Sequence, residues 1–521
     1  MVLFNIYNQP FNMEARLNAV FEKSFKENWD LPALSNFHGE TFTYGQVAQQ
    51  IAKYHQMWRE AGYEPGFRVA IWGRNSAQWV IALLAALTYG AVAVPLLHEF
   101  TPDMVKRLVE HSESKILLSA DKLVTLEDCP EVKPEDLHYY KHQPDELALI
   151  NYTSGTTSDS KGVMIPERAL WSNMAFAEQE LCDMKRGMQI VSLLPTAHMY
   201  GMAFEVLYEI CIGMHITFIT SALSAPTIMK ALQEVKPNLL VVVPMLIEKI
   251  VRKGILTKYN NMKVKMLRKL PMIRNTINKK FHDGLMQALG GNIYEIIIGG
   301  AALNAEVEAI LREIKFPYTV GYGMTECAPI MAYADWKDFE RNSCGKSVPR
   351  MELKIDSNDP QNEPGEILTR GMNMMLGYYK NEEATRKAID EDGWLHSGDM
   401  GIIDAVGNLF IKGRIKNMLL SSSGQNIYPE EIEAEVNNLP FAVESVVVMR
   451  DHRLVALVFP DRDAAKEAGL NNDEAILRSF ESERKTVNKH FPSYAQINAF
   501  EIVEKEFEKT PKKSIRRFLY K

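Results

Sequence analysis

Residues 68–97 read RVAIWGRNSAQWVIALLAALTYGAVAVPLL, and this stretch indicates the fold class. A short apolar run from Arg68 to Trp72 precedes a helix-forming run from about Ser76, and a second short apolar run begins at Ala91. Strand, helix and strand in this order predict two parallel strands joined by a right-handed crossover.

The uncharged run at residues 80–97 is also long enough to cross a membrane. However, Tyr89-Gly90 divides it and Pro95 ends it, which is typical of a buried helix that leads into a buried strand. The N-terminus has no basic stretch followed by an apolar one, so no signal peptide is predicted. We expect a cytoplasmic protein whose membrane contact is at most peripheral.

Further apolar runs of strand length follow, separated by helix-like segments. They lie at residues 115–119, 189–194, 239–244 and 295–298. A fully apolar run such as the third belongs in a sheet that helices cover on both faces. The predicted fold class is therefore α/β, with a large N-terminal domain built of α/β layers.

The pattern changes after about residue 340, where short strand-like segments are separated by Gly, Pro and Asp. They predict a smaller strand-rich subdomain with an antiparallel or mixed sheet. Its strands are expected at residues 351–355, 365–370, 407–414 and 418–422. Beyond them a helix, a strand hairpin, a charged helix and a last strand predict a compact α+β unit. We expect an N-terminal domain of residues 1–413 and a small, mobile C-terminal domain of residues 414–521.

The 521 residues include 59 basic and 66 acidic ones, a net charge of −7, and 46% are hydrophobic. These values are ordinary for a soluble globular protein. Nucleic acids bind domains with a strong basic surplus, so they are excluded as the main partner. The five cysteines are dispersed and form no Cys-x-x-Cys pair, which indicates reduced thiols rather than a zinc ribbon or a disulfide framework.

Residues 152–164, YTSGTTSDSKGVM, follow an apolar run and have the composition of a phosphate-binding loop. Small hydroxylated residues and glycine let backbone N–H groups approach phosphate oxygens, and Lys161 supplies a cation. Five residues separate Gly155 from Lys161, and Gly162 follows the lysine, so this is not a Walker loop. A flexible surface loop is the alternative for such a composition.

The string TSGTTxxxKGVM resembles the phosphate-loop signature of the adenylate-forming superfamily, which includes acyl-CoA synthetases, nonribosomal-peptide adenylation domains and beetle luciferases. Further segments resemble the family's motifs in the same order, so the resemblance covers essentially the whole chain. It implies an ATP-dependent enzyme that uses Mg²⁺ to form an acyl-AMP and then transfers the acyl group to coenzyme A. Lys161 is then catalytic, and the phosphates of ATP are bound by Thr153, Ser154, Gly155, Thr156 and Thr157.

Residues 321–326, GYGMTE, resemble the family's YGxTE segment. The resemblance implies that Tyr322 stacks on adenine and that Thr325 and Glu326 are catalytic. Thr325 would contact the α-phosphate, and Glu326 would help to hold Mg²⁺. Residues 299–303, GGAAL, resemble the loop that flanks adenine. The remaining nucleotide-binding residues that these segments imply are Gly300, Ala301, Ala302 and Gly323. Taken alone, both segments also fit ordinary turns after a strand.

Two later segments resemble motifs around the ribose and the hinge. Residues 394–401, WLHSGDMG, match W-x-x-[ST]-G-D-x-G, in which Asp399 would accept from the ribose hydroxyls. In residues 411–417, IKGRIKN, Arg414 would be a second ribose contact and Lys416 the hinge residue. Asn417 stands where Asp is commoner in the family.

The segment that follows the hinge resembles the loop and helix that meet the pantetheine arm of coenzyme A. It assigns CoA binding to Gly424, Gln425 and Asn426. The same stretch also reads simply as a helix start, with Pro429 and acidic residues in the first turn.

Residues 194–201, LPTAHMYG, resemble LPxxHxxG and imply an acyl pocket that contains His198 and Tyr200. Residues 243–250, VPMLIEKI, are similar to a stretch of long-chain acyl-CoA synthetases and add Met245, although these apolar positions also fit a core. Amino-acid adenylation domains place an aspartate near the first segment. This chain has no acidic residue between that segment and Glu205. We therefore expect a substrate acid with an apolar tail, most simply a fatty acid.

The C-terminal tail, EKTPKKSIRRFLYK, resembles a P-K-T-x-x-G-K ending whose lysine reaches the substrate carboxylate and phosphate. The alignment puts Ser514 at the lysine position, and serine cannot replace a cation. A shift of one residue lets Lys513 act as the catalytic lysine. Two alternatives to a fatty acid–CoA ligase stay open: a ligase that passes an aryl, short or other acyl group to an acyl carrier protein, and a weakly catalytic nucleotide or acyl-AMP binding protein.

Overall fold

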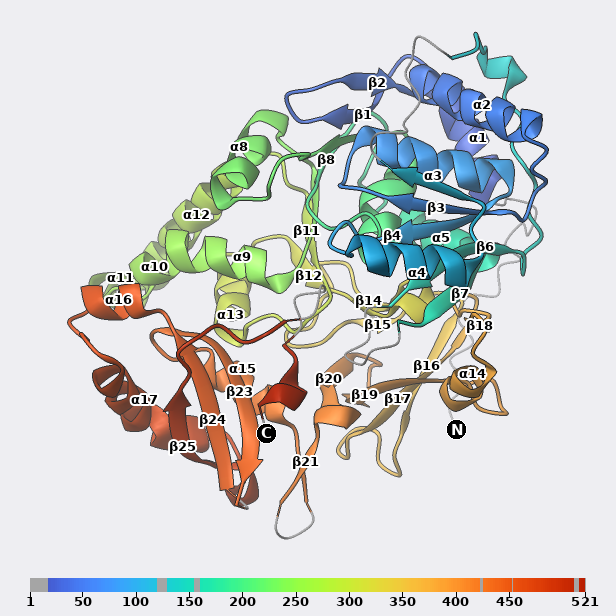
Figure 1. Cartoon of the computed structure of the whole chain (residues 1–521). Helices are drawn as coiled ribbons and strands as arrows, with labels where there is room; N and C mark the ends of the chain where they lie inside the picture. The colour runs from blue at the N-terminus through green and yellow to red at the C-terminus, as the bar shows by residue number, and fades with distance from the viewer. Residues whose placement is uncertain are drawn as a thin grey trace.

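The computed structural model describes residues 17–119, 129–153, 160–421, 425–451, 453–509 and 515–520. Helices and strands alternate over roughly the first three fifths of the chain, and strands dominate the part that follows. Figure 1 shows the large α/β body above, with the C-terminal unit and the strand-rich subdomain side by side beneath it. The predicted fold class is confirmed.

The first large sheet has seven strands in the order β12-β11-β10-β8-β9-β1-β2, all parallel except for the β1–β2 pair. Its strands are β1 (Pro32–Asn36), β2 (Thr41–Thr43), β8 (Gln189–Ser192), β9 (His215–Phe218), β10 (Leu239–Val242), β11 (Glu295–Ile298) and β12 (Tyr318–Val320). Every residue of β10 and β11 is buried, as expected for strands covered on both faces.

The second large sheet has six strands in the order β18-β7-β6-β4-β3-β5. Its strands are β3 (Arg68–Trp72), β4 (Val92–Leu96), β5 (Ile116–Ser119), β6 (Leu147–Tyr152), β7 (Gly162–Pro166) and β18 (Gly377–Tyr378). The predicted pair β3 and β4 is parallel and adjacent, which confirms the crossover.

The uncharged run at residues 80–97 forms most of α3 (Ala77–Tyr89) and then β4, and nearly all of it is buried. Ser76 caps the helix through its side chain, and Gly90 ends it with φ +87°. A side chain at position 90 would also collide with the ring of Tyr140. Among the described residues, no helix is both long and apolar enough to cross a bilayer.

Helices cover both sheets, and one hydrophobic core joins them from Leu17 to Leu409. Besides α3, the longer helices of this body are α1 (Leu17–Glu27), α2 (Tyr44–Glu60), α4 (Pro102–Ser112), α5 (Glu167–Glu180), α8 (Ala225–Val235), α9 (Pro244–Val251), α12 (Pro271–Ala288) and α13 (Ala305–Glu313). Shorter ones are α6 (Met199–Met202), α7 (Tyr208–Ile212), α10 (Thr257–Tyr259), α11 (Met262–Leu267) and α14 (Glu382–Ala388). All five cysteines are free thiols, as predicted.

The strand-rich subdomain contains the antiparallel sheet β16-β17-β19-β20. Its strands are β16 (Met351–Asp356), β17 (Gly365–Gly371), β19 (Leu395–Ile403) and β20 (Leu409–Arg414), and the small sheet β13 (Tyr322–Gly323), β14 (Ile330–Tyr333) and β15 (Lys346–Ser347) adjoins it. A strand does form within residues 418–422, where one was expected, but it does not belong to this sheet. A 3₁₀ turn, η7 (Ile415–Asn417), ends the sheet, and β21 (Leu419–Leu420) pairs instead with β22 (Asn426–Ile427).

The C-terminal unit contains the predicted hairpin of β23 (Ala442–Arg450) and β24 (Arg453–Pro460), with β25 (Ile497–Ile502) parallel to β24. Its helices are α15 (Pro429–Val436), α16 (Arg462–Glu467) and α17 (Asp473–Asn488). Alternate residues of the hairpin enter two separate cores, because successive side chains of a strand point to opposite faces. Neither core shares residues with the core of the large body.

Candidate active site

The first part of the site joins three residues that the sequence predicted as nucleoside contacts. The hydroxyl of Tyr322, on β13, donates to Oδ2 of Asp399 at 2.7 Å, and Nε of Arg414 lies 2.8 Å from Oδ1. Asp399 and Arg414 face each other in the register of β19 and β20, which fixes the ion pair. The structure therefore brings these three side chains together, although they are spread over about 90 residues of sequence.

Burial governs the electrostatics of this corner. It raises the pKa of Asp399, an effect that Arg414 and the Tyr322 hydroxyl oppose, and it raises the pKa of the Tyr322 phenol well above its ordinary value. The side chain of Arg414 is 64% exposed, so this pair leads from a buried carboxylate to the solvent. Carboxylate and guanidinium groups placed in this way can bind the hydroxyls of a sugar.

The second part of the site lies where the phosphates are expected. Nζ of Lys161 lies 4.6 Å from the ring centre of Tyr378, and the Tyr378 hydroxyl donates to Oε1 of Glu326 at 2.8 Å. The two predicted catalytic charges therefore flank one tyrosine. Strand β18 carries that tyrosine and pairs antiparallel with β7, which begins directly after Lys161.

Tyr378 was missed by the sequence analysis. It lies 217 positions from Lys161 and 52 from Glu326, and nothing in the sequence GYYK around it marks a site. The pairing of β18 with β7 brings it there. Burial and the neighbouring Glu326 raise the pKa of its phenol, so the hydroxyl keeps its proton and acts as a donor.

The backbone at the start of the phosphate loop is closed by a hydrogen bond from N–H of Thr153 to the carbonyl of Lys161, 3.0 Å long. The predicted phosphate-binding residues Ser154, Gly155, Thr156 and Thr157 lie outside the described residues. Thr325 opens the short 3₁₀ turn η6 (Thr325–Cys327) and is partly exposed.

Glycine is required at position 323, because a side chain there would collide with the carbonyl of Pro329. This close approach of the backbone seats the turn that carries Thr325 and Glu326. The carbonyl of Glu326 in turn accepts from N–H of Met375, two residues after which the chain enters β18.

The predicted acyl pocket adjoins the loop predicted to flank adenine. The hydroxyl of Tyr200 donates to the carbonyl of Ile297 at 3.0 Å, and its ring lies so close to Gly299 that a side chain there would not fit. Gly300 has φ +85°, and Ala301 and Ala302 follow it on the surface. The structure therefore connects Tyr200 with the turn after β11.

His198, partly exposed, immediately precedes α6, and the segment before it is held from two directions. The side chain of Asn151, at the end of β6, donates to the carbonyl of Ala197 at 2.9 Å. The buried carboxyl of Glu205 accepts from the N–H groups of Leu193 and Leu194, at 2.9 and 3.0 Å, and from the hydroxyl of Ser192, also at 2.9 Å. These contacts hold residues 192–197 against Glu205 and the end of β6.

Met245 lies in the first turn of α9 and is 38% exposed. It follows Val243, whose side chain lies 3.8 Å from the position that a Cβ of Gly300 would take. The structure thus places the start of α9 beside the same loop.

The hinge region carries two contacts between β20 or η7 and the first turn of α15. Lys412 pairs with Glu431 at 3.0 Å, and the Asn417 amide donates to Oε1 of Glu430 at 2.5 Å. Lys416, the predicted hinge residue, is exposed between them. Glu430 therefore explains why asparagine stands at position 417 in place of the usual aspartate. An aspartate there would face the Glu430 carboxylate and could not donate to it.

Of the predicted CoA contacts, Asn426 lies in β22, and the N–H of Gln425 donates to the hydroxyl of Ser421 at 2.9 Å. Gly424 lies outside the described residues, as do Lys513 and Ser514. The chain on either side of the tail lysines is nonetheless fixed. Lys509 pairs as an isolated bridge with Ile515 and forms an ion pair with Glu444 at 2.6 Å.

The donor set suits a metal that binds through substrate phosphates. No group of three or more His, Cys, Asp or Glu side chains converges among the described residues. Mg²⁺ is held by one or two carboxylates together with phosphate oxygens and water, rather than by a cage of protein ligands. Tyr378 occupies one oxygen of Glu326, and within the described structure the other oxygen has no hydrogen-bond partner, so this carboxylate fits such a role.

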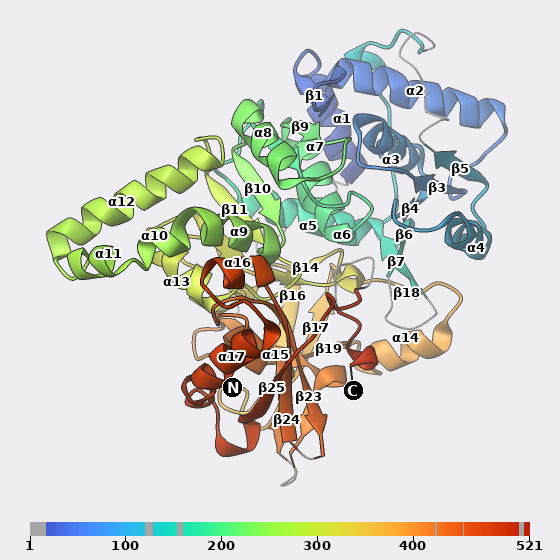
Figure 2. The same cartoon turned by 60° about the vertical axis from the view of Figure 1, so that its left-hand side comes forward.

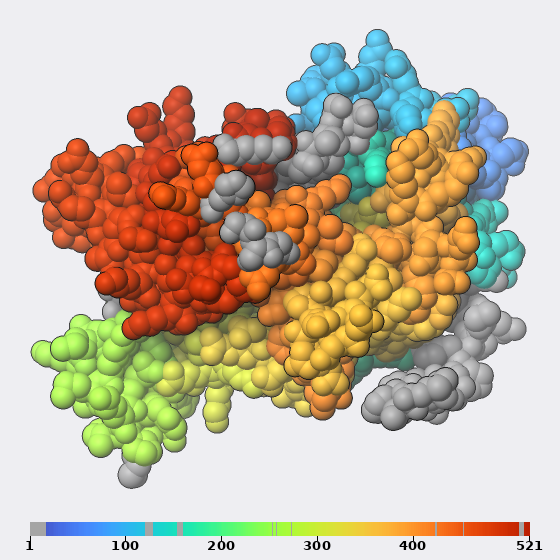
Figure 3. Space-filling view, turned by 90° about the horizontal axis from the view of Figure 1, so that it is seen from below, coloured from blue at the N-terminus to red at the C-terminus, as the bar shows by residue number. Residues whose placement is uncertain are grey.

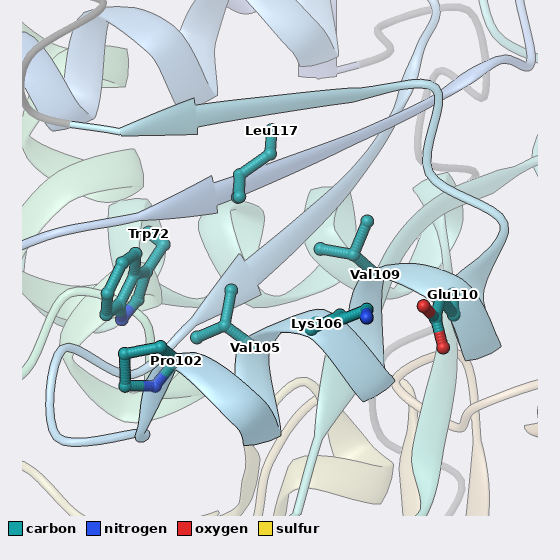
Figure 4. Close-up of a pocket in the computed structure, with 7 residues that line it drawn as sticks. All are labelled: Trp72, Pro102, Val105, Lys106, Val109, Glu110 and Leu117. Atoms are coloured by element: carbon teal, nitrogen blue, oxygen red, sulfur yellow. The ribbon is translucent and has the colours of Figure 1, made fainter.

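A separate cavity of about 320 Å³ lies between α4 and the edge of the second sheet. Figure 4 shows that α4 forms one side of it, while Trp72 and Leu117 from β3 and β5 form the other. None of its lining residues belongs to either part of the site described above.

Comparisons with known proteins match both parts of the chain to one family of enzymes. A family described as AMP-binding enzyme matches residues 21–379, and the AMP-binding enzyme C-terminal domain matches residues 416–520. The long-chain-fatty-acid–CoA ligase ACSBG2 of Rattus norvegicus is 26% identical over 82% of this chain and 74% of its own length. The 4-coumarate–CoA ligase CCL1 of Humulus lupulus is 27% identical over 94% of this chain and 90% of its own length.

Solved structures show the same fold. ATP-bound MatB from Rhodopseudomonas palustris superposes with a TM-score of 0.77 at 20% identity, over 97% of this chain and 98% of its own. The o-succinylbenzoate CoA synthetase MenE from Bacillus subtilis, in complex with its acyl-adenylate intermediate, gives 0.75 at 19% identity over 96% and 98%. The chain therefore belongs to the AMP-binding enzyme family, which confirms the predicted resemblance to adenylate-forming enzymes and the prediction of an AMP-forming acid–thiol ligase.

Proposed function

We propose that this protein activates a fatty acid with MgATP and transfers it to coenzyme A, releasing pyrophosphate and AMP. One observation carries the proposal: the segment 322–326 contributes Tyr322 to a nucleoside corner with Asp399 and Arg414, and Glu326 to a phosphate corner with Tyr378 and Lys161. Residues 1–413 form the adenylating domain and residues 414–521 the mobile domain, with the hinge at Lys416.

In the first step an oxygen of the acid's carboxylate attacks the α-phosphorus of ATP, and the bond to pyrophosphate breaks. Both reactants are anionic, so the protein must reduce their repulsion and align them. We assign contact with the phosphates to Lys161 and to the hydroxyls of Thr153, Ser154, Thr156, Thr157 and Thr325. Each donor aimed at developing negative charge contributes about 3–4 kcal/mol. Mg²⁺, held by Glu326 and the phosphates, supplies further neutralisation of charge when it is bound.

In the second step the thiol of coenzyme A attacks the acyl carbonyl, and the bond to the AMP oxygen breaks. Gly424, Gln425 and Asn426 meet the pantetheine arm, whereas Lys513 serves the first step. One small domain supplies both groups, so it must present two faces in turn, and a few torsions at the hinge achieve this.

The apolar character of the acyl pocket favours a fatty acid. Met199, Met202 and Phe204 are buried near His198 and Tyr200. Glu205 is the acid nearest in sequence, and its carboxyl is taken up by the backbone of Leu193 and Leu194. It therefore faces the protein rather than an amino-acid ammonium, and the similarity to a long-chain ligase is in keeping with this substrate.

An aryl acid is the second candidate, because the chain is equally similar to a 4-coumarate ligase. Pyrophosphate release measured with fatty, aryl, short and amino acids, each with and without CoA, tests the assignment. We expect turnover with fatty acids and a requirement for CoA to form a thioester. A preference for aryl acids would show that the proposed substrate class is wrong. Thioester formation only on an acyl carrier protein would show that the proposed acceptor, CoA, is wrong. ATP binding without turnover would indicate a nucleotide-binding protein rather than a ligase. We place the reaction in the cytoplasm.

A further inference from the structure

The segment from residue 249 to residue 280 differs in charge from the rest of the chain. It contains eleven basic residues and no acidic one. Subtracting these eleven from the total of 59 leaves 48 basic residues against 66 acidic ones elsewhere. The basic residues are Lys249, Arg252, Lys253, Lys258, Lys263, Lys265, Arg268, Lys269, Arg274, Lys279 and Lys280.

The same segment exposes large apolar side chains. Helix α11 contains no buried residue, and Met262 and Met266, one turn apart on it, are 79% and 69% exposed. Leu270, which precedes α12, is 53% exposed, and Leu267 and Ile273 are exposed beside it. Single exposed apolar residues are ordinary, but a cluster of five within twelve residues marks a contact surface.

The inner side of this segment is firmly attached to the protein. The guanidinium of Arg268 lies 3.6 Å from the ring centre of buried Tyr259 and pairs with Glu313. The amide of Asn260 donates to Glu306 at 3.0 Å. Residues 258–274 are therefore held on a rigid base.

The outer side has no such contacts. Lys258, Lys263, Lys265, Lys269 and Arg274 are exposed, and in the part of the chain that the structure describes none of them forms an ion pair with a carboxylate. Helices α9–α12 form a helical arm, on the left of Figure 2. Helix α11 and the start of α12 lie at its outer end, away from the sheets and from the C-terminal unit. A flat partner could reach this end without obstruction.

Basic and apolar side chains on one rigid outer face match the chemistry of an anionic bilayer. Lysines meet the anionic head groups, while Met and Leu side chains enter the acyl boundary. A nucleic acid would use the cations but would leave Met262 and Met266 in water. We propose that residues 258–274 dock this protein reversibly on an anionic membrane.

The docking surface is continuous with the proposed acyl pocket. Helix α9 leads from Met245, beside the loop of Gly300, to Val251, and the basic segment follows directly. A fatty acid dissolved in the same membrane would therefore be close to the pocket. The proposal does not rest on the proposed function, since docking is measured in the absence of ATP and acid.

The test is sedimentation of the full chain with phosphatidylcholine vesicles that contain or lack phosphatidylserine, at about 0.1 M salt, where the screening length is about 10 Å. We expect binding that requires phosphatidylserine and weakens at higher salt. Each basic residue near an anionic surface increases the binding constant about fivefold. The triple variant Lys263→Gln, Lys265→Gln, Lys269→Gln should therefore bind vesicles about 100-fold more weakly. Met262→Gln with Met266→Gln should weaken it roughly tenfold, because apolar side chains then leave the acyl boundary.

A matched control changes the exposed lysines Lys115, Lys133 and Lys141 to Gln, which alters the net charge equally at a distant surface. It should bind vesicles like the unmodified chain, and circular dichroism should show that all variants fold. Equal loss in the control, binding unaffected by the triple change, or equal binding to neutral vesicles would overturn the proposal. Binding to a DNA duplex that the methionine variant retains, without binding to vesicles, would assign the surface to nucleic acid instead.

Discussion

Tyr378 connects Lys161 and Glu326, the two charged residues to which we assign the phosphate chemistry. Its ring faces Lys161, and its hydroxyl orients Glu326 at 2.8 Å. Tyr378→Phe keeps the ring but removes the donor. A hydrogen bond to a charged group contributes about 1.5–3 kcal/mol, so we expect kcat/KM for MgATP to fall roughly 10- to 100-fold. The concentration of Mg²⁺ that gives half the maximal rate should rise as well.

The neighbouring tyrosine provides the control. The Tyr379 hydroxyl donates to Glu113, at the surface, at 2.9 Å, so Tyr379→Phe should leave the dependence on Mg²⁺ unchanged. Glu326→Gln should show a larger defect than Tyr378→Phe, because it alters the proposed metal ligand itself. If all three variants respond to Mg²⁺ like the unmodified chain, the roles assigned to Glu326 and Tyr378 are wrong.

The tail lysines lie outside the described residues, but their flanks are informative. Lys509 forms an ion pair with Glu444, and Arg517 forms one with buried Glu433, so the chain on both sides of the tail lysines is anchored. We expect Lys513→Ala to reduce acyl-AMP formation about 100-fold, and Lys512→Ala to have a small effect. Exchange of labelled pyrophosphate into ATP measures this step alone. Equally small effects would refute the shifted-lysine hypothesis and favour weakened adenylation.

At this scale the motifs in the sequence named Tyr322, Asp399 and Arg414, which the structure brings together, but they did not name Tyr378. Lys161, Glu326, Asp399 and Arg414 stand in recognisable motifs, and the structure pairs the last two directly. Tyr378 stands in no motif, because its position depends on a strand pairing with residues more than 200 positions away. Such a contact leaves no local pattern in a single sequence.

Among the elements, the segment from β8 to α6 depends on Glu205. Burial raises the pKa of this carboxyl to about 8, although the bonds from Leu193, Leu194 and Ser192 oppose the shift. The pKa is higher in the folded chain than in the unfolded one, so Glu205 contributes stability that is complete at low pH. That contribution decreases as the pH rises toward 8.

Glu205→Gln removes this titration while keeping an acceptor. Between pH 6 and pH 7.5 the unmodified chain should lose about 2 kcal/mol more stability than the variant, since each pH unit in this window costs about 1.4 kcal/mol. Urea unfolding at the two pH values measures the difference, and a parallel loss in both proteins would exclude Glu205 as the source. Glu205→Ala should destabilise at every pH, because it leaves buried donors unpaired.

Elements with a fully apolar run were predicted well. Residues 295–298 form β11 with the expected bounds, and residues 239–244 contain β10. The error at residues 418–422 has a physical cause. These residues are as strand-like as their neighbours, but η7 turns the chain away from the sheet, and Leu419 and Leu420 pair with β22 instead. The pairing of so short a strand depends on the direction that the preceding turn gives the chain. That direction cannot be predicted from amino-acid composition.

In the whole molecule, the C-terminal unit contacts the rest of the chain around the proposed hinge and also at a second place away from it. Away from the hinge, Arg252 donates to the carbonyl of Asn437 at 3.2 Å, and the side chain of Asn304 bonds to that of Asn438. Figure 3 shows the unit pressed against both the strand-rich subdomain and the helical arm. Both of these hydrogen bonds are polar, partly buried contacts, which suits an interface that opens. The sequence predicted a hinge and two domains but not these partners, because single Asn and Arg residues on the surface carry no pattern.

The proposed hinge is held by the pairing of Asn417 with Glu430. The other oxygen of Glu430 is buried without a partner among the described residues, so Asn417 is its main support. A side chain at Gly413 would also collide with this carboxyl, which shows how closely α15 approaches β20. Asn417→Asp would place two carboxylates in contact, and like charges at this distance disfavour the present arrangement of the two domains.

We therefore expect Asn417→Asp to change the ratio of the two half-reaction rates about tenfold, since a shift of about 1.4 kcal/mol between two domain arrangements is enough. Single-turnover measurements of acyl-AMP formation and of thioester formation provide the two rates separately. The double variant Asn417→Asp, Glu430→Gln restores a donor to the pair and should return the ratio toward that of the unmodified chain. An equal decrease in both rates, with no rescue by Glu430→Gln, would mean that the contact stabilises the fold and takes no part in exchanging the two faces of the small domain.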